Sequence, residues 1–301
     1  MAALQTLENT ARGVVHKGRR RWKLGKRWVA RARLDLKDQR EGKRNPLLPP
    51  RRLNLPSQIA GVGGRLVDLM EEAGGLEPDS DVLDIGCGPG RTAAVLTGRL
   101  NASGSYEGFD VMPKSIAWCQ KAITSRFPNF HFQLADLQNG QYNPKGRQRA
   151  GEYDFPYGNE RFDVAVAGSL FTHLRPFEAQ RYLDETARVL RPGGRLVGTW
   201  FLIDDEVEEA LAAGRIRRPT VLNDSHPPLR LEHHLTDEQG NAFRSFDPVT
   251  PEFMIAVDLD AVREQHERAG LRVVEVRPGR WAARETEQLL GQDVVIAERA
   301  G

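Results

Sequence analysis

The chain has 301 residues, of which 40% are hydrophobic, which is enough for one large α/β domain with extensions. It has only two cysteines, Cys87 and Cys119, so neither a disulfide framework nor a cysteine metal site is expected. No apolar run approaches the roughly 18 residues that a membrane-spanning helix needs. We therefore expect a cytoplasmic protein that attaches to a membrane only peripherally, if at all.

The net charge of +2 hides an uneven distribution. Residues 1–52 hold 16 Lys and Arg against 4 Asp and Glu, and they end in a proline-rich stretch, 45–50, that cannot continue a helix. A basic amphipathic helix is predicted over residues 19–40 by apolar or small residues at helical spacing, namely Trp22, Gly25, Val29, Ala32 and Leu36. The sequence thus predicts a basic arm with a linker (1–52) before a larger domain (53–301).

Three interpretations of the basic arm remain open. The arm is solvated or docks on the acidic domain of its own or a neighbouring chain, it lies on an anionic membrane surface, or it contacts nucleic-acid phosphates. The first is favoured, the membrane surface comes second, and nucleic acid is the least favoured partner.

From about residue 56, short apolar runs alternate with amphipathic stretches, which is typical of a mostly parallel sheet flanked by helices. A helix is expected over 57–73, and further helices begin at Thr92, Pro113 and Pro176. Residues 203–255 break the alternation and are interpreted as an insertion, after which comes a helix that Gly270 ends. The expected strands are 82–85, 105–110, 130–135, 162–167, 195–202, 271–277 and 293–298.

A glycine-rich turn, residues 86–90, follows the first expected strand and allows close approach of the backbone to a ligand. Alone, it fits a dinucleotide site, another nucleotide-like ligand or merely a tight turn. Three acids favour a ligand, because Asp84, Asp110 and Asp136 close successive strands whose ends converge in a doubly wound sheet. Asp110 is placed to accept hydrogen bonds from ribose hydroxyls and Asp136 from an adenine amino group, while Met112 packs on the ring.

The segments 82–90, 108–110, 133–136, 162–166 and 187–194 resemble, in order, motifs of the class I S-adenosylmethionine-dependent methyltransferases. The resemblance implies an α/β fold with a doubly wound, seven-stranded, mostly parallel sheet in the order 3-2-1-4-5-7-6, whose last strand is antiparallel. It also implies S-adenosyl-L-methionine as cofactor. The residues implied to bind it are Asp84, Gly86, Cys87, Gly88, Gly90, Asp110, Met112, Asp136, Leu137, Gly168 and Ser169.

Methyl transfer from a sulfonium is a direct in-line displacement, so the chemistry does not demand a dedicated catalytic residue. For a hydroxyl acceptor, His173 is the candidate base, because its segment faces the methyl side of the crevice in this family. The alternative is that His173 caps the following helix or contacts the cofactor carboxylate indirectly. Metal-dependent relatives carry an acidic ligand where this chain has Ala167-Gly168-Ser169, so no metal is expected.

The insertion holds His226, His233 and His234, which we interpret as part of a loop or substrate lid rather than a zinc site. His266 lies on an apolar helical face and is expected in the core. The favoured function is methylation of a small-molecule or glycan acceptor on oxygen. The alternatives are an RNA or protein methyltransferase that uses the basic arm, and a non-catalytic binder of adenosyl ligands.

Overall fold

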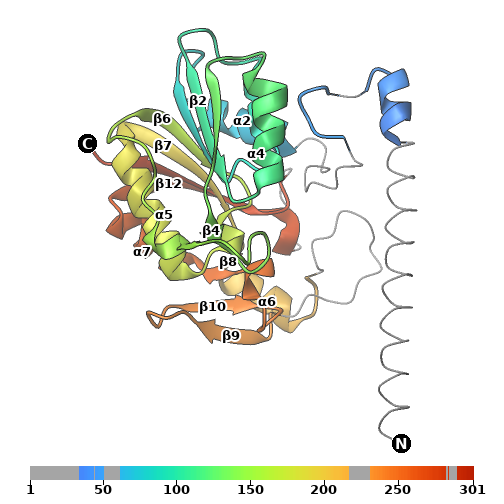
Figure 1. Ribbon diagram of the computed structural model, residues 1–301. Coiled ribbons are helices and arrows are strands. Elements are labelled where there is room, and N and C mark those ends of the chain that lie inside the picture. The colour runs from blue at the N-terminus through green and yellow to red at the C-terminus, as the bar shows by residue number, and fades with distance from the viewer. Residues whose placement is uncertain (1–33, 44, 51–61, 217–230, 283, 285–289) are drawn as a thin grey trace, which may run out of the picture. The chain divides into compact units, whose positions relative to one another are not determined.

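The computed structural model describes residues 34–43, 45–50, 62–216, 231–282, 284 and 290–301 (Figure 1). The chain divides into two compact units, Met1–Gln58 and Ile59–Gly301. In the first unit, residues 34–40 are helical and 45–50 form turns. The predicted basic helix lies outside the described residues up to residue 33. Among the helices that the structure describes, none is both long and apolar enough to cross a bilayer.

Seven strands of the second unit form one sheet in the order β12-β13-β7-β6-β1-β2-β3 (Figure 1). Strand β13 is antiparallel to both of its neighbours, whereas the other neighbouring pairs are parallel. Numbered along the chain, this is the order 3-2-1-4-5-7-6, so the predicted fold is confirmed. The strands are β1 (Asp81–Ile85), β2 (Ser105–Asp110), β3 (Phe130–Leu134), β6 (Phe162–Ala167), β7 (Leu190–Trp200), β12 (Leu271–Arg277) and β13 (Asp293–Arg299).

Helices cover both faces of this sheet, with α2 and α4 on one side and α5 and α7 on the other (Figure 1). The apolar side chains of α2, including Leu66 and Met70, recur at helical spacing and are buried. Helix α4 continues directly as a π-helical turn, Gln120–Thr124. The helices are α2 (Val62–Glu72), α3 (Arg91–Leu96), α4 (Pro113–Cys119), α5 (Pro176–Val189), α6 (Asp205–Ala212) and α7 (Leu259–Arg268).

Local side chains set where several helices begin and end. The Asp258 carboxylate accepts hydrogen bonds from the backbone N–H groups of Asp260 and Ala261 (2.9 and 3.2 Å) and so caps α7. Asp204 caps α6 in the same way through the N–H of Val207 (3.0 Å). Helix α3 ends at Leu96, and Gly98 follows it closely.

The fifth strand was expected over 195–202, but it begins at Leu190 and includes Pro192-Gly193-Gly194. In the β6–β7 ladder, Phe162 pairs with Leu190 and Val164 with Arg195, so the register shifts between them. Gly193 has a φ of 79°, which glycine adopts without strain, and Pro192 lacks a backbone N–H. The segment therefore forms an irregularity inside β7 rather than a boundary before it.

The segment 203–255 forms a group of short elements with its own core (Figure 1). Strands β9 (His233–Thr236) and β10 (Ala242–Ser245) make a hairpin, and η5 (Pro251–Phe253) is a 3-10 turn. Strand β8 (Leu202–Ile203) pairs in parallel with β11 (Val257–Asp258), which joins the two ends of the segment. The buried apolar residues of this core are Phe201, Ile203, Val207, Ala210, Ile216, Leu231, Met254, Ala256, Trp281 and Ala282.

Candidate functional site

The glycine turn after β1 depends on backbone conformations that favour glycine. Gly86, Gly88 and Gly90 have φ values of 77°, 53° and 82°. A Cβ atom at Gly90 would lie 2.8 Å from Cδ1 of Ile123 and 3.0 Å from Sγ of Cys119, whereas one at Gly88 would meet no atom within 4 Å. The turn therefore packs closely on α4 at Gly90, whereas the space beside Gly88 is open and leaves room for a ligand.

Asp110, at the end of β2, holds this turn in place. Its Oδ2 accepts a hydrogen bond from the N–H of Gly88 and its Oδ1 one from the N–H of Met112, both at 2.8 Å. The side chain is buried, and burial raises its pKa. A carboxylate has about four acceptor positions, so Asp110 keeps capacity for ribose hydroxyls.

Asp84, in β1, is also buried, and its Oδ2 accepts a hydrogen bond from the Tyr106 hydroxyl at 2.7 Å. Burial raises the pKa of Asp84 to about 7, with the neighbouring Asp110 charge adding to the shift and the Tyr106 hydrogen bond opposing it. Within the described residues, neither Asp84 nor Asp110 forms an ion pair within 4 Å, although the charge of the half-buried Arg91 acts on Asp84 and lowers its pKa. A cationic ligand would offset this buried negative charge, and S-adenosylmethionine carries both an ammonium and a sulfonium.

The third acid, Asp136, lies at the surface after β3. Its Oδ2 is 2.5 Å from Nε of Arg147, and this hydrogen bond holds the pKa of Asp136 below its ordinary value. Asn143 Nδ2 approaches Oδ1 at 3.4 Å. Its role toward adenine stays a prediction, as do those of Leu137, which is buried in β4 (Leu137–Gln138), and half-buried Met112 at the start of α4.

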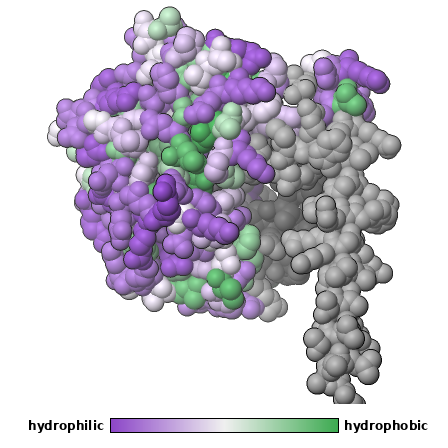
Figure 2. Space-filling model, viewed as in Figure 1, coloured by the Kyte–Doolittle hydropathy of each residue, from purple (hydrophilic) through white to green (hydrophobic). Residues whose placement is uncertain are grey.

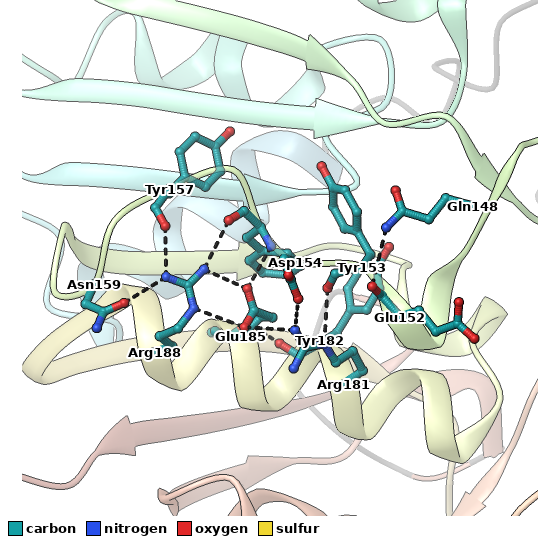
Figure 3. A network of polar contacts seen from close by, with 12 residues as sticks. Gln148, Glu152, Tyr153, Asp154, Tyr157, Asn159, Arg181, Tyr182, Glu185 and Arg188 are labelled. Atoms are coloured by element: carbon teal, nitrogen blue, oxygen red, sulfur yellow. Dashed lines mark hydrogen bonds and ion pairs between the residues drawn. The ribbon is translucent and has the colours of Figure 1, made fainter.

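The loop that follows is fastened to α5, as Figure 3 shows. The guanidinium of Arg188 donates to the carbonyl oxygens of Phe155 and Tyr157 (3.0 and 2.8 Å) and contacts Glu185 at 2.6 Å. Glu185 in turn accepts a hydrogen bond from the N–H of Phe155 at 2.7 Å. Arg181 binds Asp154 and the carbonyl of Tyr153. These contacts fix residues 153–159 against a helix.

On the other side of the crevice, Ser169 follows β6 with a φ of 57°, unusual for a residue with a side chain. Its N–H donates to Oγ1 of Thr199, and its hydroxyl donates to Oε1 of Gln292 at 2.8 Å. The Thr199 hydroxyl donates to the same Gln292 oxygen, also at 2.8 Å. Gly168 is close-packed, since a Cβ there would lie 2.6 Å from Cδ1 of Leu66. No local pattern in the sequence indicated Gln292, which precedes β13.

His173 ends the 3-10 turn η4 (Phe171–His173) and is half-buried. Its Nδ1 lies 2.7 Å from the carbonyl oxygen of Glu252, and its Nε2 lies 3.4 Å from the hydroxyl of Tyr142. A carbonyl only accepts hydrogen bonds, so Nδ1 carries the proton and Nε2 has a free lone pair in the neutral ring. Burial lowers the pKa of His173, which favours this neutral form.

Three segments far apart in the sequence meet at His173. Asn139 Oδ1 accepts hydrogen bonds from the N–H groups of Gln141 and Tyr142, both at 3.0 Å, and its Nδ2 is 3.3 Å from the His173 carbonyl. The Glu252 carboxylate pairs with Arg175 at 3.0 Å. The loop 139–143, η4 and η5 are therefore joined around one imidazole.

The remaining histidines lie elsewhere. His233 and His234 are in strand β9 opposite Ser245 and Arg244, and His226 lies outside the described residues. His266 is fully buried in α7, as predicted. Where the structure describes side chains, no group of three or more His, Cys, Asp or Glu could hold a metal ion.

Comparison with known proteins identifies this fold further. A family model for a methyltransferase domain matches residues 82–194. The chain is 34% identical over 118 residues to phthiotriol/phenolphthiotriol dimycocerosates methyltransferase of Mycobacterium leprae, covering 38% of this chain and 35% of the relative. It is 30% identical over 118 residues to O-methyltransferase cnsE of Penicillium expansum, covering 38% and 36%. The chain thus spans about a third of the length of these curated relatives.

Among solved structures, 1,6-didemethyltoxoflavin-N1-methyltransferase of Burkholderia thailandensis matches with a TM-score of 0.48 and 16% identity, covering 91% of this chain and 89% of that one. The family match covers the glycine turn, both buried acids and the segment with His173. The strand order agrees with the same family. Residues 82–194 therefore form a methyltransferase domain, and the strand order is that of the class I methyltransferases, whose cofactor is S-adenosyl-L-methionine.

Proposed function

We propose that the protein transfers a methyl group from S-adenosyl-L-methionine to an oxygen of a small-molecule acceptor by in-line displacement. One observation carries the oxygen acceptor: the Glu252 carbonyl keeps the proton of His173 on Nδ1, so Nε2 is free to accept one. A hydroxyl acceptor must lose its proton during the transfer, and His173 Nε2 would receive it.

The cofactor supplies an activated methyl group. Asp84 and Asp110 would face its positive charge and ribose, and the open side of the turn at Gly88 would accommodate it. Ser169, held by Thr199 and Gln292, would shape the wall between cofactor and acceptor. These residues bind and orient, which is the main requirement when the donor is already activated.

Tyr142 would assist at the acceptor. Its hydroxyl points at His173 Nε2, and the two rings meet at 89° with centroids 5.2 Å apart. At 3.4 Å this hydrogen bond is long, so an acceptor hydroxyl can replace it at Nε2. Tyr142 thus keeps the imidazole aligned before the acceptor arrives.

The names of the two curated relatives support a small-molecule acceptor over a glycan, and one of them is an O-methyltransferase. The RNA and protein alternatives depend on the basic arm, most of which lies outside the described residues. No contact in the site favours them.

Two measurements test the proposal. Calorimetry should detect binding of S-adenosylmethionine and S-adenosylhomocysteine, and failure of both to bind would contradict the cofactor site. Methyl transfer from labelled S-adenosylmethionine should then be screened over hydroxylated small molecules. With the best acceptor, His173→Asn should lower kcat by about 100-fold or more, with unchanged affinity for S-adenosylhomocysteine. His234→Asn, in the exposed hairpin, is the matched control; equal turnover of both variants would remove His173 as the base.

A further inference from the structure

We propose that the loop 246–253 binds an apolar portion of the methyl acceptor, so that the acceptor is an amphiphile rather than a fully polar metabolite. The proposal rests on the proposed function and names the class of molecule that its acceptor site takes. The loop lies outside the segment that the family model matches.

The loop exposes apolar side chains within a short stretch of the sequence. Val249 is 87% exposed and Phe253 44% exposed, and the exposed Pro248 lies beside Val249. Only three other large apolar side chains in the described part of the chain are as accessible, and just one of those, Leu134, is in the second unit. Figure 2 shows a largely hydrophilic surface on which hydrophobic residues gather in a few places. Single exposed apolar residues are ordinary, whereas two on one short loop that also contacts the candidate site suggest a binding surface.

The loop is also held in one conformation by its own polar groups. The Asp247 carboxylate accepts hydrogen bonds from the N–H groups of Val249 and Thr250 (2.9 and 3.2 Å). The buried Ser245 hydroxyl donates to the carbonyl of Pro251 at 3.2 Å. The apolar side chains are therefore presented by an ordered loop, and a ligand that covers them does not have to order the backbone first.

The same loop reaches the candidate base. Glu252 accepts the hydrogen bond of His173 Nδ1 through its carbonyl, and Phe253 is the next residue. A Cβ atom at Gly140 would lie 3.4 Å from Cγ2 of Thr250 and 3.0 Å from the Glu252 carboxylate, so the loop also adjoins residues 139–143, which carry Tyr142. Phe253 thus directly follows the residue whose carbonyl holds His173, and the loop borders the segment that carries Tyr142. We therefore assign the apolar end of the acceptor to this loop when its hydroxyl is at His173 Nε2.

These features favour an apolar group over a polar one as the occupant of the loop surface. A polar chain would lose its hydration against Val249 and Phe253 without gaining hydrogen bonds from their side chains, whereas an alkyl or aromatic group gains by burying them. The geometry assigns the hydroxyl end to His173 and the apolar end to the loop.

The test uses the full chain saturated with S-adenosylhomocysteine and, as probe, dodecyl β-D-maltoside below its critical micelle concentration. Titration calorimetry should detect binding of this probe to the native chain and much weaker binding of the butyl analogue. In Val249→Asp/Phe253→Asp the affinity for the dodecyl probe should fall at least about tenfold. The matched variant Val249→Ile/Phe253→Leu keeps the surface apolar and should bind as the native chain does.

Either of two results would overturn the inference: no binding of the dodecyl probe to the native chain, or equal binding by the aspartate pair. Sedimentation velocity can give a third result that would overturn it. If the aspartate pair converts a native dimer to a monomer, a second copy covers the loop instead. S-adenosylhomocysteine affinity is measured in each variant, so a misfolded variant is recognised. Failure of the cofactor to bind would contradict the proposed function, whereas loss of probe binding alone would contradict only this inference.

Discussion

The proposed cofactor side and the proposed acceptor side of the site are built differently. On the cofactor side, the glycine turn and Asp110 lie 22 residues apart in the sequence and are joined by one hydrogen bond between neighbouring strands. On the acceptor side, His173 and Glu252 are 79 residues apart, and Ser169 and Gln292 are 123 apart. A local pattern therefore specifies the cofactor side, whereas the acceptor side depends on long-range contacts made by segments outside the family match.

The largest expected effect is on the cofactor side, at Gly90. In Gly90→Val the side chain meets Ile123 and Cys119 and the φ of 82° is strained, so the free energy of unfolding should fall by about 3 kcal/mol. The turn must also shift, and affinity for S-adenosylhomocysteine should be lost. Urea unfolding and calorimetry measure the two effects.

The control for this substitution is Gly193→Ala. Gly193 has a similar φ of 79°, but a Cβ there meets no atom within 4 Å. We expect a loss of about 1 kcal/mol in unfolding free energy and unchanged cofactor affinity. If Gly90→Val behaved like this control, the close packing of the turn on α4 would not matter for binding.

A loss of stability of similar size is expected at low pH, at a buried histidine that lies behind the proposed acceptor side. Phe171 of η4 stacks on Trp200 with centroids 4.2 Å apart, and Trp200 contacts the buried His266. Burial lowers the pKa of His266 to about 4. Because this lies below the ordinary value of 6.5, the unfolded chain takes up the proton first, so stability is complete above about pH 6.5 and falls as the pH approaches 4.

At pH 4, the loss of unfolding free energy attributed to His266 should reach about 3 kcal/mol. His266→Leu should lack it, so the difference in unfolding free energy between the native chain and this variant should change by that amount between pH 7 and 4. A constant difference across this range would show that His266 does not titrate as its burial implies.

A smaller effect is expected at Asp84, because burial raises the pKa of this carboxyl group to about 7. A cationic cofactor favours the ionised carboxylate, so affinity for S-adenosylmethionine should fall by up to about tenfold per pH unit below pH 7. In Asp84→Asn this pH dependence should disappear, whereas Asp79→Asn, on the exposed turn before β1, should keep it. A flat profile in the native chain would mean that Asp84 does not face the cofactor charge.

The smallest effect is expected at Gln292. In Gln292→Leu the hydroxyls of Ser169 and Thr199 lose their shared acceptor, which costs about 1 kcal/mol, or roughly fivefold in kcat/KM for the acceptor. Affinity for S-adenosylhomocysteine should stay close to native if Gln292 serves the acceptor side. A loss confined to cofactor affinity would assign Gln292 to the other side.

This division explains what the sequence could predict. The predicted strands 82–85 and 162–167 match β1 and β6 to within one residue, because buried parallel strands form short apolar runs. The predicted strand 105–110 matches β2 although its sequence, Ser-Tyr-Glu-Gly-Phe-Asp, is not an apolar run. The order of the sheet came from the family resemblance. By contrast, the ion pair of Asp136 with Arg147 and the contact of His173 with Glu252 depend on how loops fold back, which no periodicity encodes. Gln292 was missed for the same reason.

Strand β13 has a consequence for synthesis. It is the last strand of the chain, yet it lies between β7 and β12 and separates them in the sheet. During translation β12 therefore has no strand to pair with until β13 emerges, and Gln292 arrives with it. A ribosome that stalls before this point would release a chain with an exposed sheet edge and an incomplete acceptor wall. Such a fragment would be a substrate for quality control rather than a partly competent enzyme.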